Sequence, residues 1–273
     1  MKRKKKSVLM DLIMLPLCAI VAYPFIYVLM GAFKSRGEFA VNPYGWPQSA
    51  TIQNFLKAFE GVSFIRILWN NIFITALSVL AVTIISAMAA YAVVYNNCKV
   101  NRGIRIYLLL GFFIPFQATL LPLYQLYSSM GLMDKLYGII LLHAGSISLP
   151  FFMFYGSIQG LPREYAEAAW MDGCSVPGTF FRIIFPLTRP VMITQVIFTF
   201  FATWNDYLAP SLFLTSRDKG VLILEVTRSV SRNSVDWGRS FAVVTITLIL
   251  PFIFFLAAQK YLISGMAAGG VKG

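Results

Sequence analysis

The sequence predicts an all-α polytopic membrane protein with six transmembrane helices. Hydrophobic residues make up 58% of its 273 residues and charged residues only 12%, about half of the share that soluble domains carry. The charged residues stand between long apolar stretches that contain no Asp, Glu, Lys or Arg. These stretches lack the alternation of membrane β-barrel strands, and unpaired backbone groups are not tolerated in lipid. We therefore expect each stretch to be a helix.

Most of the stretches are long enough to cross a bilayer singly, because a helix rises about 1.5 Å per residue and the hydrocarbon core is about 30 Å thick. They cover residues 12–33, 67–98, 106–133, 136–162 and 240–259. A shorter stretch begins at Pro190 and is interrupted by Asp206, so we expect a helix from about Val191 to Tyr207 or Leu208. The six predicted spans are 10–32, 71–95, 106–127, 136–157, 191–208 and 241–263.

Basic residues predict the orientation of these spans. The segment MKRKKK precedes the first span, and such clusters stay on the cytoplasmic side of the membrane. An even number of spans then returns the C-terminus to the cytoplasm. Residues 1–273 would form one transmembrane domain, with a cytoplasmic loop at 159–189 between the fourth and fifth spans. The first span is longer than the apolar part of a secretory signal and no A-x-A site follows it, so we expect it to stay uncleaved.

The residues argue against several classes of function. The chain contains no G-x-x-x-x-G-K-[ST] loop for ATP, no C-x-x-C pair and no H-E-x-x-H motif, so we expect no catalytic site, cofactor or metal in it. The net charge of +12 indicates attraction to membrane lipid rather than to nucleic acid, because the basic residues are scattered over loops on both sides. His143 shares a helical face with Ser146; a hydrolase could use this pair, but a polar contact between packed helices is the better interpretation.

The loop at 159–189 holds a compact acidic segment, EYAEAAWMDG, at residues 164–173. Pro162 suits the start of a helix, where its missing N–H costs nothing, and Gly173 suits the end of one. Ser175 predicts the cap of a second short helix, which we expect Pro186 to end. One face of the first helix carries, at helical spacing, Glu164, Glu167, Ala168 and Met171. Such a face is also compatible with a plain interfacial helix that is solvated on one side.

A longer pattern in this loop points to a more specific role. The loop contains EAA at 167–169, Gly173, Ile183 and FP at 185–186, which together resemble the EAA signature of the permease subunits of ABC-type importers. The family usually ends this signature with Leu-Pro, and Phe185 is a conservative departure. The closest likeness is to the smaller permease of maltose-type and other oligosaccharide importers. It is carried by WP at 46–47, NF at 54–55, YA at 91–92, FIPFQ at 113–117, LPLY at 121–124, GL at 131–132, WN at 204–205 and GGVKG at 269–273.

This resemblance implies a type I ABC-importer permease fold and a set of partners. The partners would be a second permease subunit, two ATPase subunits that bind ATP and Mg, and an extracytoplasmic solute-binding protein. The cargo would be a sugar, and the location would be the cell membrane of a prokaryote. The loop helix would dock on an ATPase subunit, with Glu167 paired to a basic residue. Ala168 and Ala169 would permit close approach, and Gly173 would make the turn. The residues implied in coupling are Glu164, Glu167, Ala168, Ala169, Met171, Asp172, Gly173 and Pro186.

Three further contacts follow from the resemblance. The tail would reach between the ATPase subunits through Gly270, Val271, Lys272 and Gly273. The outer loop at 217–238 would touch the binding protein through Val230, Ser231, Arg232 and Asn233. A sugar path combines aromatic faces with a few polar groups, and its candidates are Gln117, Tyr124, Trp204, Asn205 and Asp206. Each set has an alternative role. The tail could be a disordered end and the outer loop a solvated connector, and the aromatic path residues could lie at the membrane interface.

Two alternatives stay open. An importer permease for another solute, such as a polyamine or an amino acid, would share the loop signature. A stand-alone secondary carrier or channel would need no ATPase, but the spans hold no acid for a proton relay apart from Asp11 and Asp206 near their ends. Genes for a second EAA-bearing permease and a secreted binding protein beside this one would favour the importer over the carrier.

Overall fold

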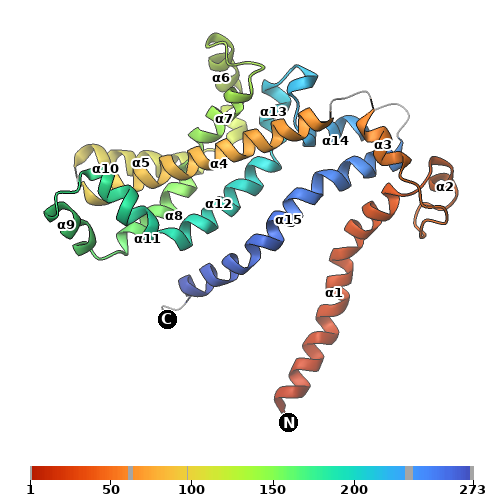
Figure 1. The fold of residues 1–273 in the computed structure, drawn as a ribbon, viewed down its shortest axis with the longest axis horizontal. Helices are drawn as coiled ribbons and strands as arrows, with labels where there is room; N and C mark the ends of the chain where they lie inside the picture. Colours follow the sequence, from red (N-terminus) through yellow and green to blue (C-terminus); the bar gives the residue numbers. More distant parts are fainter. Residues whose placement is uncertain (1, 61–63, 97, 231–235, 271–273) are drawn as a thin grey trace. The chain divides into compact units, whose positions relative to one another are not determined.

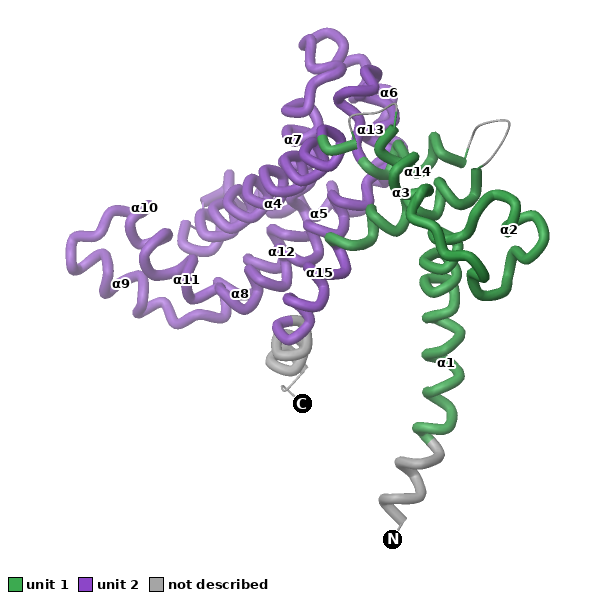
Figure 2. The backbone as a smooth tube through the Cα atoms, turned by 45° about the vertical axis from the view of Figure 1, so that its right-hand side comes forward, with its two compact units in different colours: residues 1–65, 222–250 green, residues 66–221, 251–273 purple. Residues whose placement is uncertain are grey.

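A computed structural model of the chain describes residues 2–60, 64–96, 98–230 and 236–270 (Figure 1). All regular elements in these residues are helices, as the sequence predicts. They fall into two compact units, coloured separately in Figure 2: unit 1 comprises Met1–Ile65 and Leu222–Leu250, and unit 2 comprises Arg66–Val221 and Pro251–Gly273. The long C-terminal helix α15, Trp237–Gly270, contributes residues to both units.

The described residues contain up to six candidate spans, the number that the sequence predicts. Single helices account for three of them: Met10–Ala32 within α1 (Lys2–Ala32), α4 (Phe64–Tyr95), and Trp237–Tyr261 within α15. The others are pairs of helices that are long and apolar enough only together. These are α5 (Lys99–Phe113) with α6 (Phe116–Ser129), bent by 108°; α7 (Leu136–Gly145) with α8 (Ser148–Gln159), bent by 47°; and Val176–Leu187 with α12 (Arg189–Trp204), bent by 81°.

The bends are the main difference from the predicted spans, since 106–127 and 136–157 are each interrupted near the middle. Pro115 explains the first interruption. It lacks a backbone N–H donor and holds the preceding residue, Ile114, in an extended conformation with φ −83° and ψ 115°. The second interruption falls at Ser146, which also departs from helical geometry. Pro150 explains it, because it has no N–H to donate to the carbonyl of Ser146 and its ring clashes with that carbonyl.

The predicted span 191–208 ends earlier than expected, at Trp204. The cause is Asp206, whose carboxylate accepts the backbone N–H groups of Leu208 (3.0 Å) and Ala209 (3.3 Å). An acidic side chain in this position caps a new helix. That helix is α13, Leu208–Phe213.

The loop between α8 and α12 is built from short helices. They are α9 (Glu164–Met171), α10 (Val176–Thr179), a π-helical turn η1 (Phe180–Ile184) and α11 (Phe185–Leu187). The prediction that Pro186 ends the second short helix is wrong. The wider turn of η1 lets the N–H of Phe185 donate to the carbonyl of Phe180, and the helix continues past the proline to Leu187. The chain turns at Thr188, whose hydroxyl donates to the carbonyl of Phe185 at 2.7 Å.

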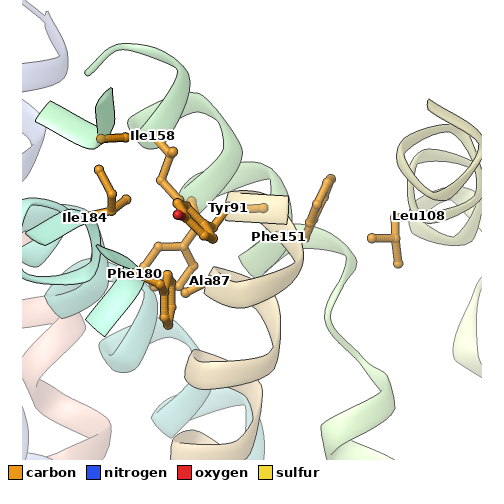
Figure 3. Packing of buried hydrophobic residues seen from close by; sticks show 10 residues of the cluster. Ala87, Tyr91, Leu108, Phe151, Ile158, Phe180 and Ile184 are labelled. Atoms are coloured by element: carbon orange, nitrogen blue, oxygen red, sulfur yellow. The ribbon is translucent and has the colours of Figure 1, made fainter. Parts of the chain in front are cut away.

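The core of unit 2 joins this loop to the spans. Figure 3 shows side chains from the loop and from α4, α5 and α8 packed in one cluster. Its buried members are Ala87, Ala90 and Tyr91 of α4, Leu108 of α5, Phe151, Phe154 and Ile158 of α8, Ala166 of α9, and Phe180 and Ile184 of η1. The short helices α9 and η1 therefore share one packed core with α4 and α8.

Unit 1 is held by close contacts around the end of α1. The buried amide of Asn54, on α3 (Gln53–Phe59), donates to the carbonyls of Ala32 (2.9 Å) and Lys34 (2.7 Å). A Cβ on Gly31 would lie 2.2 Å from the ring of Phe241, so only glycine fits where α1 meets α15 in this unit. The remaining helices of unit 1 are α2 (Arg36–Val41) and α14 (Leu222–Val230).

Candidate functional site

The ends of α9 follow from its local sequence. Pro162 lies two residues before the first residue of α9, Glu164. Glu164 and Glu167 occupy the first turn, where the helix dipole favours acids. Gly173 has φ 80°, a left-handed conformation that favours glycine, and its N–H donates to the carbonyl of Trp170 at 3.0 Å. The prediction that Gly173 ends this helix is confirmed.

The second short helix is capped as predicted. The hydroxyl of Ser175 accepts the N–H of Gly178 at 3.2 Å, and Pro177 lies in the first turn of α10. The hydroxyl of Tyr91, from α4, donates to the carbonyl of Val176 at 3.4 Å. Cap and tyrosine together fix the start of α10 against the membrane helix.

The two faces of α9 are sharply different. Ala166 and Ala169 are buried, and Trp170 contacts the ring of Tyr95 edge-on with centroids 5.9 Å apart. Ala169 is only 3% exposed, so of the two alanines expected at a docking surface only Ala168 is on the exposed face. The spacing of three residues between the buried alanines places both toward the core.

The outer face of α9 carries the other residues expected in coupling. Met171 is 89% exposed, and Glu164, Glu167, Ala168 and Asp172 are exposed as well. Within the part of the chain that the structure describes, the carboxylates of Glu164, Glu167 and Asp172 form no ion pair. This face therefore presents unpaired negative charge beside a small residue and an exposed thioether.

Two sets of predicted contact residues lie largely outside the described residues. Of the tail, Gly270 is the last residue of α15, and Val271, Lys272 and Gly273 lie outside. Of the outer loop, Val230 is the half-exposed last residue of α14, and Ser231, Arg232 and Asn233 lie outside.

A second candidate site is a cavity of about 400 Å³ within unit 2, between α4, α6, α7, α8 and α12. Phe116 and Phe198 contribute aromatic rings to its wall. Its polar lining consists of His143, Ser146, Gln195, Thr199, Thr203 and Asp206. The cavity thus combines hydrogen-bonding groups, of which Asp206 is an acid, with aromatic faces, as sites for small polar ligands do.

The cavity includes only one of the five residues predicted for a substrate path, Asp206. Trp204 is buried and stacks on Phe200 with centroids 5.7 Å apart, and Asn205 is exposed at the end of α12. Gln117 and Tyr124 are exposed on α6 and do not line this cavity.

Sequence reasoning missed the polar row on α12. Gln195, Thr199 and Thr203 recur every fourth residue, which places them about 6 Å apart along one face of an otherwise apolar helix. Thr83 of α4 donates to the amide oxygen of Gln195 at 2.8 Å, and the amide nitrogen of Gln195 donates to Thr199 at 2.7 Å. The four-residue repeat was the available signal.

His143 links three helical segments at the cavity wall. Its Nε2 lies 2.9 Å from a carboxylate oxygen of Asp206, and its Nδ1 lies 3.1 Å from the hydroxyl of Ser78 on α4. Serine, histidine and aspartate stand in the order of a hydrolase triad, but Ser78 is 0% exposed and no substrate can reach its hydroxyl. The interpretation of His143 as a polar contact between packed helices is confirmed, with Ser78 as its partner in place of Ser146.

Comparisons with known proteins place this geometry among transport proteins. Residues 82–267 match the model of a family described as "Binding-protein-dependent transport system inner membrane component". The chain is 31% identical over 252 residues to the probable starch degradation products transport system permease protein AmyC of Thermoanaerobacterium thermosulfurigenes, covering 91% of each chain. It is 29% identical over 263 residues to the melibiose/raffinose/stachyose import permease protein MelC of Bacillus subtilis (strain 168), covering 94% of this chain and 95% of MelC.

A solved structure shares the fold. A chain of a bacterial ABC transporter involved in the import of the acidic polysaccharide alginate superposes with a TM-score of 0.86, covering 94% of this chain and 96% of that one. The sequence identity in this superposition is 17%, so the likeness is one of fold.

Proposed function

Because this chain belongs to the family of binding-protein-dependent transport system inner membrane components, we propose that it is the permease subunit of an ABC importer that moves a sugar or oligosaccharide into the cytoplasm. Its partners are a second permease subunit, two ATPase subunits that bind ATP and Mg, and an extracytoplasmic solute-binding protein. It lies in the cell membrane of a prokaryote with both termini in the cytoplasm. The cargo named for the relatives AmyC and MelC, starch degradation products and melibiose, raffinose or stachyose, supports a carbohydrate.

One observation supports the coupling role: α9 is packed against the core on one side, and on its other side it exposes acids without an ion-pair partner among the described residues. Ala166 shares a core with Tyr91 of α4 and Phe154 of α8, so a push on α9 reaches the spans. The exposed face carries acids that no described residue neutralises. A plain solvated helix would need neither the core contact nor the π-helical connection to α12.

The residues divide between contact and support. Glu167 pairs with a basic residue of the ATPase, Ala168 lets that surface approach, and Met171 supplies an apolar contact. Ala169 supports the helix from its buried side, and Gly173 turns the chain into α10. Glu164 and Asp172 add charge at the rim, and Pro186 belongs to the connection toward α12. The tail at 270–273 contacts the ATPase, and residues 230–233 contact the binding protein.

The cavity favours a neutral, hydroxyl-rich cargo over a polyamine. A polyamine needs free carboxylates, whereas Asp206 already faces His143 and caps α13. The row of Gln195, Thr199 and Thr203 offers neutral donors and acceptors beside aromatic rings. Uptake assays with labelled disaccharides, trisaccharides, amino acids and spermidine, with the binding protein titrated in parallel, test this choice. Uptake of spermidine and of no sugar would refute it.

Charge reversal tests the coupling. In the assembled importer in vesicles, Glu167→Arg should lower sugar uptake and binding-protein-stimulated ATP hydrolysis at least about tenfold, because removing one partner of a desolvated ion pair costs about 2–5 kcal/mol. Glu60→Arg is the matched control, an exposed acid at the end of α3 outside the loop, and should transport normally. Wild-type uptake by Glu167→Arg, or an equal loss in Glu60→Arg, would contradict the proposal.

A further inference from the structure

A second, smaller cavity of about 200 Å³ lies where α4 and α8 end and α5 begins. Three arginines line it, Arg102, Arg105 and Arg163. Two neutral polar side chains, Tyr155 and Gln159, complete its polar wall. We refer to this cavity as the arginine pocket. Arg102 and Arg105 come from the first two turns of α5, Tyr155 and Gln159 from α8, and Arg163 from the residue before α9.

The arginine pocket has positive charge that the described residues do not balance. No acidic side chain lines it. Among the described residues none of the three arginines forms an ion pair. Glu167 follows Arg163 by one helical turn, but the two side chains are not paired. Arg105 donates to the hydroxyl of Tyr155 at 2.9 Å, a neutral contact that orients its guanidinium but leaves its charge. Like charges held in one concavity repel one another, so the pocket suits an anion.

Phosphate is the anion whose chemistry matches this set of donors. Each guanidinium offers a planar fork of N–H groups that fits two oxygens of a phosphate. A phosphodiester carries one negative charge, as a carboxylate does, but its oxygens are arranged tetrahedrally and can meet forks from different directions, whereas a carboxylate offers two oxygens in one plane. Tyr155 and Gln159 can bind the further oxygens and hydroxyls of a phosphate ester.

The surroundings of the pocket favour a phosphate with an apolar tail. Val93 and Val94 of α4 form part of its wall. Along α5, Ile106, Leu109 and Phe113 follow Arg102 at the spacing of one helix face, and all three are exposed. A polar pocket thus leads directly into an apolar strip on a membrane-spanning segment. The pocket is also at the end of the spans that the sequence places in the cytoplasm, where anionic lipids concentrate.

We propose that the arginine pocket binds the phosphate headgroup of an anionic glycerophospholipid, with an acyl chain along α5. The bound phosphate joins Arg102 and Arg105 of α5 to Arg163. Since Arg163 directly precedes α9, the lipid braces the entry of the loop helix against the membrane. This site is independent of the cargo that the permease carries.

Short-chain lipids test the assignment on the full chain, purified in a non-ionic detergent with the subunits that accompany it. Binding of dioctanoyl phosphatidylglycerol, dioctanoyl phosphatidylcholine and inorganic phosphate is measured by native mass spectrometry and by the shift in melting temperature. Phosphatidylglycerol should bind at least tenfold more tightly than phosphatidylcholine. In the double variant R102Q/R163Q this preference should fall at least tenfold. Neither arginine has a partner among the described residues, so the lipid-free melting temperature should not change.

Lys99→Gln provides the matched control, because Lys99 is an exposed cation on the first turn of α5 that does not line the pocket. It should bind phosphatidylglycerol as the wild type does. Equal loss in Lys99→Gln would mean that general surface charge holds the lipid, and would overturn the proposal. Equally tight binding of inorganic phosphate would assign the pocket to a free phosphate instead. If the wild type shows no preference for an anion, the lipid assignment is refuted, and the arginines would instead pair with an acidic side chain of a partner protein.

Discussion

The two ends of α4 are fastened to their neighbours by different forces. At its C-terminal end, the rings of Tyr91 and Tyr95 pack on Phe180 (5.3 Å between centroids) and Trp170 (5.9 Å). At its N-terminal end, polar groups make the contacts. The amide of Asn70 donates to the carbonyls of Asp218 (2.9 Å) and Gly220 (3.1 Å) around a short turn, η2 (Arg217–Lys219).

Asp134 organises the polar end. It adopts φ 54°, which is uncommon outside glycine, and its own N–H donates to the carbonyl of Phe213 at 2.7 Å. One carboxylate oxygen accepts the N–H groups of Thr215 (3.1 Å) and Ser216 (2.9 Å), and the other lies 2.7 Å from the ammonium of Lys219. The strained backbone is held by these contacts together.

The difference shows how charge is distributed between structure and partners. The polar end uses its carboxylates internally, in Asp134 with Lys219 and in Asp218 with Arg66. The apolar end is held by aromatic and aliphatic packing, so its acids on α9 and its arginines around the second cavity stay unpaired among the described residues. The polar end thus uses its charges in contacts within the chain, whereas the charges at the apolar end are available for the partners that we propose.

The largest expected effect comes from removing a ring at the apolar end. Phe180 is 2% exposed and contacts Tyr91 and Phe185, so Phe180→Ala should lower stability by about 3–5 kcal/mol. Phe181→Ala is the control, since that neighbouring ring is 50% exposed and should lose much less. Thermal unfolding in detergent measures both. Equal losses would mean that the ring cluster does not hold the loop.

The faces of α9 predict a separation of stability from transport. Ala169→Leu overfills a buried position and should destabilise the protein by about 1–3 kcal/mol. Ala168→Leu adds the same atoms on the exposed face, so it should change stability by about 0.5 kcal/mol or less while it impairs ATP-driven uptake. Melting curves and uptake in vesicles distinguish the two. If Ala168→Leu transports normally, close approach to the exposed face is not needed.

Much of this organisation could be predicted from the sequence because it depends on neighbours in the chain. Apolar length predicts the spans, Gly173 its turn and Ser175 its cap. The face of Ala169 could not be predicted, since alanine suits a docking surface and a core equally well. The contact of His143 with Ser78 and Asp206 joins residues separated by 65 and 63 positions, and no local pattern encodes it.

The prediction of unbroken spans failed although prolines in the sequence mark both bends. Pro115 marks one bend in the sequence itself. Pro150 marks the bend at Ser146 in the same way, because a proline cannot donate to the carbonyl four residues before it. The arginine pocket, in contrast, could not be predicted from the sequence. No local pattern distinguishes Arg102, Arg105 and Arg163 from other basic residues, and the fold brings them to one cavity.

The smallest effect concerns the polar end and appears as a pH dependence. Burial alone would raise the pKa of Asp134, but hydrogen bonds from Lys219, Ser216 and Thr215 outweigh it and hold that pKa well below its usual value. The hydrogen bond with Asp134 in turn raises the pKa of Lys219. A carboxyl with a lowered folded-state pKa stabilises the protein fully above its unfolded pKa of about 4, and this stabilisation is lost as the pH falls further. A lysine with a raised pKa stabilises below its unfolded pKa of about 10.4, and its contribution is lost as the pH rises beyond that.

The pair should therefore contribute a constant amount between about pH 5 and pH 10. Asp134→Asn keeps the oxygen that accepts the N–H groups of Thr215 and Ser216. It removes the charge, and with it the oxygen that accepts from Lys219 and from the hydroxyl of Ser216. Its melting temperature should lie a little below that of the wild type at pH 7, because solvent screens a partly exposed pair. On acidification from about pH 5 to pH 3 the melting temperature of the wild type should fall more than that of the variant, so the difference between the two melting temperatures should shrink. A gap that stays constant over this range would show that the charge of Asp134 does not stabilise the polar end, and the contrast between the two ends of α4 would then rest on hydrogen bonds alone.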